Sequence, residues 1–190
     1  MDADFAVELG EGDPVLDLPW SADGGPSYLD LKRHPELLPG LQECVWYPEL
    51  AEFLRGVNSS ASAFESAKCD AWCTSEMLPE DEIFGAALKF GSYVDLLFSR
   101  DDARFSFPVY EEFARSVSDL LKRAPEMPCA AEFLIRRCYF QQSTQVQTGY
   151  YLTFYLFGYG DEEEQARQRW AIGLKLVENA LRQLSAAYRS

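Results

Sequence analysis

Residues 149–158 read GYYLTFYLFG, and this stretch decides the fold. Both alternating sets of positions in it are aromatic or apolar, which is typical of a strand inside a sheet rather than at its edge. Residues 161–188 then place apolar side chains at steps of three and four, a pattern that predicts a long amphipathic helix. Because such an apolar stripe has to be buried, we expect this helix to pack on the sheet that contains residues 149–158.

The remaining elements follow from proline positions and from alternation. Shorter helices are expected to begin at Pro48 and Pro108, since proline is favoured at the first helical position. The other predicted strands are residues 27–31, 64–74, 84–98 with a break or bend at Gly91, and 131–141. The sequence therefore predicts an α+β fold in the order β-α-β-β-β-α-β-β-α. Its antiparallel sheet should have about five to six strands, with the helices on one face.

Length and composition favour a single domain preceded by an acidic N-terminal segment. A chain of 190 residues is long enough to bury one core. Residues 1–24 are rich in Gly, Pro and Asp with little periodicity, which predicts a largely irregular N-terminal segment, and residues 25–190 are predicted to form one α+β domain. Within the segment, Leu16, Leu18 and Trp20 alternate with Asp17 and Pro19. This piece could therefore add to a sheet edge or pack on its own domain, and the alternative is a partner-binding motif.

Short patterns recur in the same order along the chain. SYLDL at residues 27–31 is echoed by SYVDL at 92–96, and YPELA at 47–51 by YEEFA at 110–114. They predict a tandem βαββ duplication with halves 25–91 and 92–160 followed by a helix at 161–188, although unequal intervals leave chance recurrence open.

In arrangement, such a duplication resembles tandem βαββ effector-binding domains. The same order of elements also resembles the layout of small acidic secretion chaperones. Neither resemblance rests on a sequence motif, so neither assigns a function or a binding residue.

Charge and cysteine content limit the classes of partner and compartment. The net charge is −14, and residues 1–31 hold eight acids and no base, which leaves 23 acids against 17 bases in the remainder. This balance argues against nucleic acid or anionic membrane as ligands and permits a basic protein partner. An odd number of scattered cysteines, five, favours a reducing compartment. Because the sequence also shows neither a membrane span nor a signal-peptide pattern, we expect a cytoplasmic protein.

Motifs for catalysis and metal binding are absent from the sequence. The chain has one histidine, His34, and its cysteine spacings match no zinc pattern. No glycine-rich phosphate loop or nucleophile elbow is present, so we expect no enzyme, no cofactor and no metal. A two-carboxylate site has no local signature; Asp30 and Asp95 occupy matching places in the suspected repeat, and bonding to turns is their plainer role. Arg136 and Arg137 lie mid-strand, where one should face the helices and needs a partner, such as an acid on a neighbouring strand.

An aromatic surplus is the strongest pointer to a binding surface. If Tyr150 and Phe154 face the helices, Tyr151, Tyr155 and Phe157 face the other side, where an antiparallel sheet ordinarily shows water a polar surface. The N-terminal segment around Trp20, a second copy of the chain, or a ligand or partner are three open ways to cover it. The candidate binding residues are Trp20, Trp72, Tyr93, Tyr139, Tyr151 and Tyr155.

Two hypotheses of function follow. The first is a non-catalytic protein-interaction module, such as an adaptor, a secretion-chaperone-like protein or an immunity-type inhibitor, that holds a basic partner or a second copy through an acidic, tyrosine-rich surface. The alternative is a sensor for a cationic or aromatic small molecule, with a pocket between the two βαββ halves. Shape discriminates between them, because a sensor needs a concave aromatic pocket and an interaction module needs an exposed, flat surface.

Overall fold

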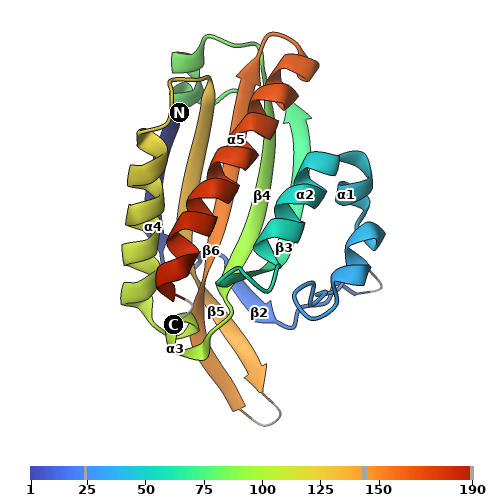
Figure 1. Ribbon diagram of the computed structural model, residues 1–190, viewed down its shortest axis with the longest axis vertical. Helices are drawn as coiled ribbons and strands as arrows, with labels where there is room; N and C mark the ends of the chain where they lie inside the picture. Colours follow the sequence, from blue (N-terminus) through green and yellow to red (C-terminus); the bar gives the residue numbers. More distant parts are fainter. Residues whose placement is uncertain (24, 143–144, 189–190) are drawn as a thin grey trace.

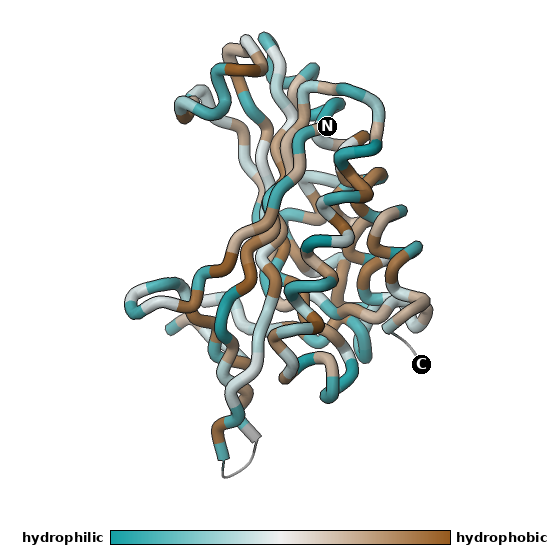
Figure 2. Tube along the Cα trace, turned by 90° about the vertical axis from the view of Figure 1, so that its left-hand side faces the viewer, coloured by the Kyte–Doolittle hydropathy of each residue, from teal (hydrophilic) through white to brown (hydrophobic). Residues whose placement is uncertain are grey.

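The computed structural model describes residues 1–23, 25–142 and 145–188, which form one six-stranded sheet with the helices on one face (Figures 1 and 2). The strands are β1 (Asp2–Glu8), β2 (Val15–Leu18), β3 (Phe64–Thr74), β4 (Leu88–Phe98), β5 (Cys129–Gln142) and β6 (Gln145–Gly160). The helices are α1 (Gln42–Trp46), α2 (Pro48–Val57), α3 (Asp101–Arg104), α4 (Phe107–Lys122) and α5 (Glu163–Ser185). Short 3-10 turns are η1 (Pro35–Gly40), η2 (Pro79–Phe84) and η3 (Ala186–Tyr188). The predicted α+β class and the long C-terminal helix are confirmed.

The sheet is mixed, so the prediction of an antiparallel sheet is wrong. Its strand order is β1-β5-β6-β4-β3, and β2 continues along β5 where β1 ends. The pairs β3–β4, β4–β6 and β5–β6 are antiparallel, whereas β1 and β2 both run parallel to β5. Parallel pairing is possible here because a long stretch of chain separates β1 from β5, whereas a tight hairpin would impose the antiparallel direction.

The N-terminal segment, for which the sequence predicts largely irregular structure, contributes two strands to the sheet, β1 and β2. The Met1 ammonium donates a hydrogen bond of 3.0 Å to the Pro125 carbonyl oxygen, and Ala3 is buried in the main core. Asp2 and Asp4 alternate with the inward residues and are exposed at the edge of the sheet. Their charges made the segment resemble a solvated tail, although alternation with small apolar residues is compatible with an edge strand.

The predicted strand at residues 27–31 and the predicted break at Gly91 are both missing from the structure. Residues 27–31 form no strand, and only Ser27 makes an isolated bridge, with Ser21. Conversely, β4 passes through Gly91 without a break, because Gly91 pairs with Trp72 on one side and with Phe157 on the other. The βαββ duplication stays a prediction, since its first strand is missing, but α2-β3-β4 and α4-β5-β6 are both helix–strand–strand units that meet where β4 pairs with β6.

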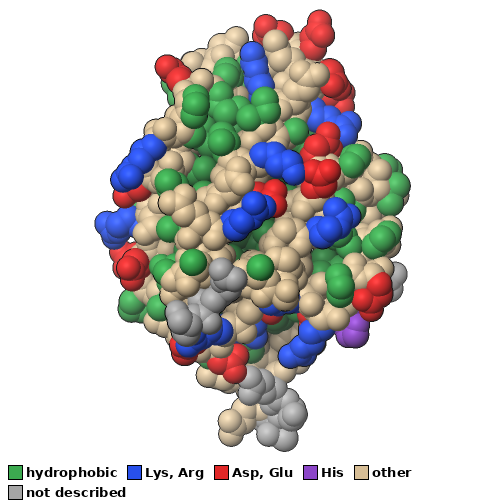
Figure 3. Space-filling view, in the orientation of Figure 1, with side chains coloured by type: hydrophobic (Ala, Val, Ile, Leu, Met, Phe, Trp, Pro, Cys, Tyr) green, Lys and Arg blue, Asp and Glu red, His purple; other side chains and the backbone are tan. Residues whose placement is uncertain are grey.

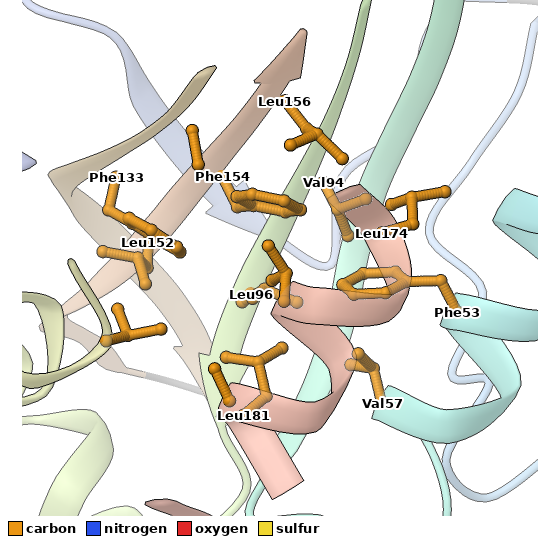
Figure 4. Packing of buried hydrophobic residues seen from close by; sticks show 14 of the residues in the cluster. Phe53, Val57, Val94, Leu96, Phe133, Leu152, Phe154, Leu156, Leu174 and Leu181 are labelled. Carbon is orange, nitrogen blue, oxygen red and sulfur yellow. The ribbon is translucent and has the colours of Figure 1, made fainter. Parts of the chain in front are cut away.

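One layer of helices buries the main core. Helix α5 lies over β6 and β4, with α4 on one side of it and α2 on the other (Figure 1). Aromatic and aliphatic side chains fill the space between the layers, among them Phe53, Phe154 and Leu174 (Figure 4). Burying one such side chain contributes about 1.5–3 kcal/mol. The fully buried Trp170 of α5 also donates a hydrogen bond of 2.8 Å to the Ser92 hydroxyl of β4, which fixes the helix on the sheet.

Ion pairs cover the outer side of the helix layer. Arg167 of α5 lies 3.0 Å from Glu49 of α2, and Lys175 lies 2.6 Å from Glu52. Figure 3 shows Lys and Arg side chains beside Asp and Glu side chains over this face. Exposed pairs of this kind each contribute less than about 1 kcal/mol, so this face is an ordinary solvated surface.

Candidate binding surface

The candidate site lies on the open face, the side of the sheet on which the described residues place no α-helix (Figure 2). Side chains alternate along a strand, so residues next to the core residues Val94, Phe154 and Leu156 point to this side. Tyr93 of β4 and Tyr155 of β6 are therefore on the open face and face each other across paired strands.

Both ends of the open face are covered by the chain itself. At one end, Leu16 and Leu18 pack in a second hydrophobic cluster with Leu97, Phe140 and Tyr151. Trp20 extends this cover: its indole N–H donates a hydrogen bond of 2.9 Å to the Ala67 carbonyl oxygen.

At the opposite end, the turn η2 folds onto the sheet. The rings of Phe84 and Tyr159 stack with centroids 4.0 Å apart, and the Tyr159 hydroxyl donates a hydrogen bond of 2.6 Å to Asp81. The second carboxylate oxygen of Asp81 pairs with the Lys89 ammonium at 2.6 Å. A strip of the open face remains between the two covers.

Four aromatic rings fill this strip. We call them the aromatic strip: Trp72 of β3, Tyr93 of β4, and Tyr155 and Phe157 of β6. Neighbouring ring centroids lie 5.9–6.4 Å apart around a closed circuit, and all four side chains are partly exposed. Gly91 lies beneath them, where a Cβ would come within 2.8 Å of the Phe157 ring and 3.1 Å of the Trp72 ring. The rings thus close over Gly91 and form a packed platform.

A row of polar residues crosses the sheet beside the aromatic strip, with one residue from each of five strands. Its members are Glu8, Arg136, Thr153, Asp95 and Lys68. The Arg136 guanidinium donates hydrogen bonds of 2.7 Å to Glu8 and 2.9 Å to the Thr153 hydroxyl. The Thr153 hydroxyl in turn donates a hydrogen bond of 2.7 Å to Asp95 Oδ1. Asp95 pairs in register with Lys68 on the next strand. Charges alternate along the row, so the buried charges are compensated.

Burial dominates the electrostatics of the row. Burial raises the pKa of Asp95 from 3.8 to about 6, opposed by the Thr153 hydrogen bond and by the charges of Lys68 and Arg136. Burial also disfavours the charged form of Arg136, but the hydrogen bond to Glu8 helps to raise its pKa above the usual value. The pKa of Tyr93 is raised by burial and by the charge of Asp95, so its phenol stays neutral at physiological pH.

The sequence-predicted binding residues divide into three groups. Trp72, Tyr93 and Tyr155 come together in the aromatic strip. Tyr151 lies on the same face but is buried under Leu16 and Leu18, and Trp20 belongs to that cover. Tyr139 lies an even number of positions after Phe133 on β5, so both side chains are on the same face of the sheet. Phe133 packs in the main core, and Tyr139 therefore points away from the open face.

Other site residues were missed or placed differently. Phe157, two positions after Tyr155, was assigned to this face by alternation but was not selected as a binding residue. Arg136 points to the open face and pairs with Glu8 on a neighbouring strand. Arg137 is the one on the helix side, and its guanidinium donates a hydrogen bond of 3.0 Å to the Leu9 carbonyl oxygen in place of the expected acid. Asp30 lies in a loop, where it accepts a hydrogen bond of 2.9 Å from the Arg33 backbone, and no described hydrogen bond links it to Asp95.

A groove of about 350 Å³ runs beside the outer edge of β3, and we call it the edge groove. On its open-face side it is lined by Trp20 and Tyr93. On the helix side it is lined by Leu29, Leu31 and Leu41, which belong to or pack on the main core. The carboxylates of Glu43 and Asp70 also line the groove.

No protein-family model, curated protein or solved structure matches this chain. Within the described ranges, no group of His, Cys, Asp and Glu side chains is arranged to hold a metal ion. The helices found there all lack the combination of length and apolar character that a membrane crossing requires.

Proposed function

We propose that this chain is a non-catalytic protein-interaction module that binds its partner on the aromatic strip. The observation that carries the proposal is the strip itself: four rings in mutual contact, partly exposed, on the face without helices. Aromatic side chains are enriched in the centres of protein interfaces because they bury a large area at a small entropic cost. Two covers frame the strip, so a partner needs to exclude water only from the gap between them.

Charge around the strip favours a basic partner. Exposed Asp70 pairs in register with Tyr93, and exposed Glu132 pairs with Tyr155. The cations Lys89 and Arg136 nearby are already bound to carboxylates. With a net charge of −14, the molecule would attract a cationic partner over long range, and the rim acids would then pair with its Lys or Arg side chains.

The small-molecule sensor receives less support from this geometry. The rings of Trp72 and Phe157 fill the space above Gly91. The aromatic strip is therefore a packed surface without a pocket between its rings that could enclose a small molecule. The edge groove includes Tyr93 alone of the four strip residues and lies at the side of the sheet, away from the β4–β6 boundary between the two helix–strand–strand units.

Photocrosslinking in the native host tests the proposal. A benzophenone amino acid replaces Tyr155 in one variant and Ile172 in another, because Ile172 is an exposed apolar residue of α5 on the opposite face. We expect a defined adduct with a basic protein from position 155 and none from position 172. Identical adducts from both positions, or no adduct from position 155, contradict the proposal. An adduct of twice the chain mass would assign the strip to a second copy instead.

A further inference from the structure

The outer strands of the two helix–strand–strand units, β5 and β3, differ in what covers their outer edges. The outer edge of β5 is covered by β1 and β2, which add to it in parallel. The outer edge of β3 has no strand beside it in the described part of the chain (Figure 1). An uncovered strand edge presents unpaired backbone groups to other chains.

Alternation identifies the backbone groups that β3 presents. In an antiparallel pair, every second residue directs its N–H and C=O away from the partner strand. The Ala71 N–H is one of these, since it donates a hydrogen bond of 2.7 Å to the Asp70 carboxylate. The same alternation turns the N–H and C=O groups of Cys69 and Cys73 outward.

Side chains from outside β3 protect only the first part of this edge. The Lys32 ammonium donates a hydrogen bond of 2.8 Å to the Phe64 carbonyl oxygen, and the Trp20 indole donates one of 2.9 Å to that of Ala67. Among the described residues, no hydrogen bond reaches the outward N–H and C=O groups of Cys69 and Cys73. Apart from the Ala71 N–H, which the Asp70 carboxylate caps, the edge is therefore open from Lys68 to Thr74.

The edge groove offers walls on both sides of an added strand. Side chains of such a strand alternate between the two faces of the sheet. Those on one face would meet Trp20 and Tyr93, and those on the other would meet Leu29, Leu31 and Leu41. The groove thus suits an extended segment with apolar side chains on both faces.

Charge distinguishes a foreign segment from a second copy of this chain. Glu43 and Asp70 line the groove, and neither is in an ion pair within the described residues. The one cation of the lining, Lys68, holds its ammonium 4.7 Å from the Trp20 ring and neighbours Asp95. Pairing of β3 with its own copy would bring Asp70 near a second Asp70, whereas a Lys or Arg side chain would neutralise it.

We propose that the outer edge of β3, from Lys68 to Thr74, is a strand-addition site for an extended segment of the partner. This segment carries apolar side chains on both faces and a Lys or Arg beside Glu43 and Asp70. The inference rests on the proposed function, because Trp72 and Tyr93 border this edge and the same partner would then cover the aromatic strip. Main-chain hydrogen bonds supply affinity in this binding mode, and the side-chain walls supply specificity.

A display selection with a matched variant tests the proposal. Random twelve-residue peptides on phage are selected on the wild-type protein, and their binding is compared with the variant Ala71→Pro. Proline at position 71 removes an N–H that takes no part in the β3–β4 pairing, so the strand should stay folded while the added strand is blocked. We expect selected peptides to be enriched in Lys and Arg, to include apolar residues, and to bind Ala71→Pro at least tenfold more weakly.

Hydrogen exchange gives a readout that does not depend on the variant. With a selected peptide bound to the wild-type protein, the amides of Cys69 and Cys73 should exchange at least tenfold more slowly. Unchanged exchange at both amides, no enriched peptide, or equal binding to both variants overturns the proposal. Slower exchange that appears with rising protein concentration and no peptide would assign the edge to a second copy.

These experiments can disprove the strand-addition site and the binding of a partner on the aromatic strip independently of each other. If crosslinking at position 155 captures a basic partner while peptides bind wild type and Ala71→Pro equally, the strand-addition site is wrong and the interaction module stands. If the edge amides are protected by peptides but position 155 captures nothing, the partner surface is the edge alone.

Discussion

At the scale of single residues, Asp95 is the most consequential side chain of the open face. It is buried in the sheet, and its described hydrogen bond comes from the Thr153 hydroxyl. The folded protein holds the proton of this carboxyl more tightly than the unfolded chain does, because burial raises its pKa to about 6. The folded state therefore binds more protons between about pH 4 and pH 6, and the contribution of Asp95 to stability falls as the pH rises through this window.

Replacement of this carboxyl tests that account. Asp95→Asn keeps an acceptor for Thr153 and removes the titration, so its free energy of unfolding relative to wild type should rise by about 2–3 kcal/mol between pH 4 and pH 7. Urea unfolding at several pH values measures the difference. Asp119→Asn, at an exposed position on α4, is the control and should show no comparable gain. A difference between Asp95→Asn and wild type that does not vary with pH would contradict the burial of a titrating carboxyl.

Part of the site followed from the sequence because alternation within a strand is local. Two steps of two, from Tyr151 through Thr153 to Tyr155, placed these side chains on one face, and the pairing of β6 with β4 agrees with it. The links between strands were beyond the sequence: Glu8 lies 128 positions from Arg136, and Thr153 lies 58 positions from Asp95. Tyr139 was wrongly expected on the open face for the same reason. The sequence of β5 alone does not show which of its residues share a face with Tyr155 of β6.

At the scale of elements, the docking of α5 on β6 depends on small residues at the contact. The Trp170 amide nitrogen and the Ala166 carbonyl oxygen of α5 occupy the space where a Cβ on Gly158 would lie. At Gly173, a Cβ would instead meet the Cys129 sulfur at 2.6 Å and a methyl group of Leu156 at 3.1 Å. Backbone atoms of a helix cannot move alone, whereas these side chains can shift.

The two glycines should therefore differ in their tolerance of alanine. Gly158→Ala should lower the free energy of unfolding by about 3 kcal/mol, because the whole helix must move away from the sheet. Gly173→Ala should change it by no more than about 1 kcal/mol, since the helix propensity of alanine offsets part of the crowding. Chemical unfolding of both variants measures this order, and equal losses would show that α5 is not held by close backbone approach.

Elements with strong periodicity were the ones that the sequence predicted. Helix α2 begins at Pro48 as expected, and residues 64–74 form β3 with the predicted bounds. Strand β1 was missed because three of the seven residues of Asp2–Glu8 are acidic and parallel pairing with β5 leaves no turn signal nearby. The alternation of Leu16 and Leu18, in contrast, allowed the edge strand that β2 forms. Residues 27–31 have strand-like alternation but lie in a loop that is tied by Lys32 to the start of the β3 edge.

At the scale of the whole molecule, the net charge of −14 determines how a partner approaches. Long-range attraction accelerates association with a basic partner and is screened by salt. The association rate constant should fall about tenfold or more between low salt and about 0.5 M salt, with a smaller change in the dissociation rate constant. Stopped-flow or surface-binding kinetics, with the partner identified by crosslinking, measures both rate constants. An association rate constant that does not change with salt concentration would argue against a basic partner.

The most direct test of the aromatic strip is the affinity of that partner, measured by titration calorimetry, for wild type, Tyr155→Ser and Ile172→Ser. Tyr155 lies in the strip, and Ile172 is an exposed apolar residue on the opposite face. We expect Tyr155→Ser to weaken binding tenfold or more, as for a residue at the centre of an interface, and Ile172→Ser to change it less than about twofold. Equal affinities for all three proteins, or a larger loss for Ile172→Ser, would contradict partner binding on the open face.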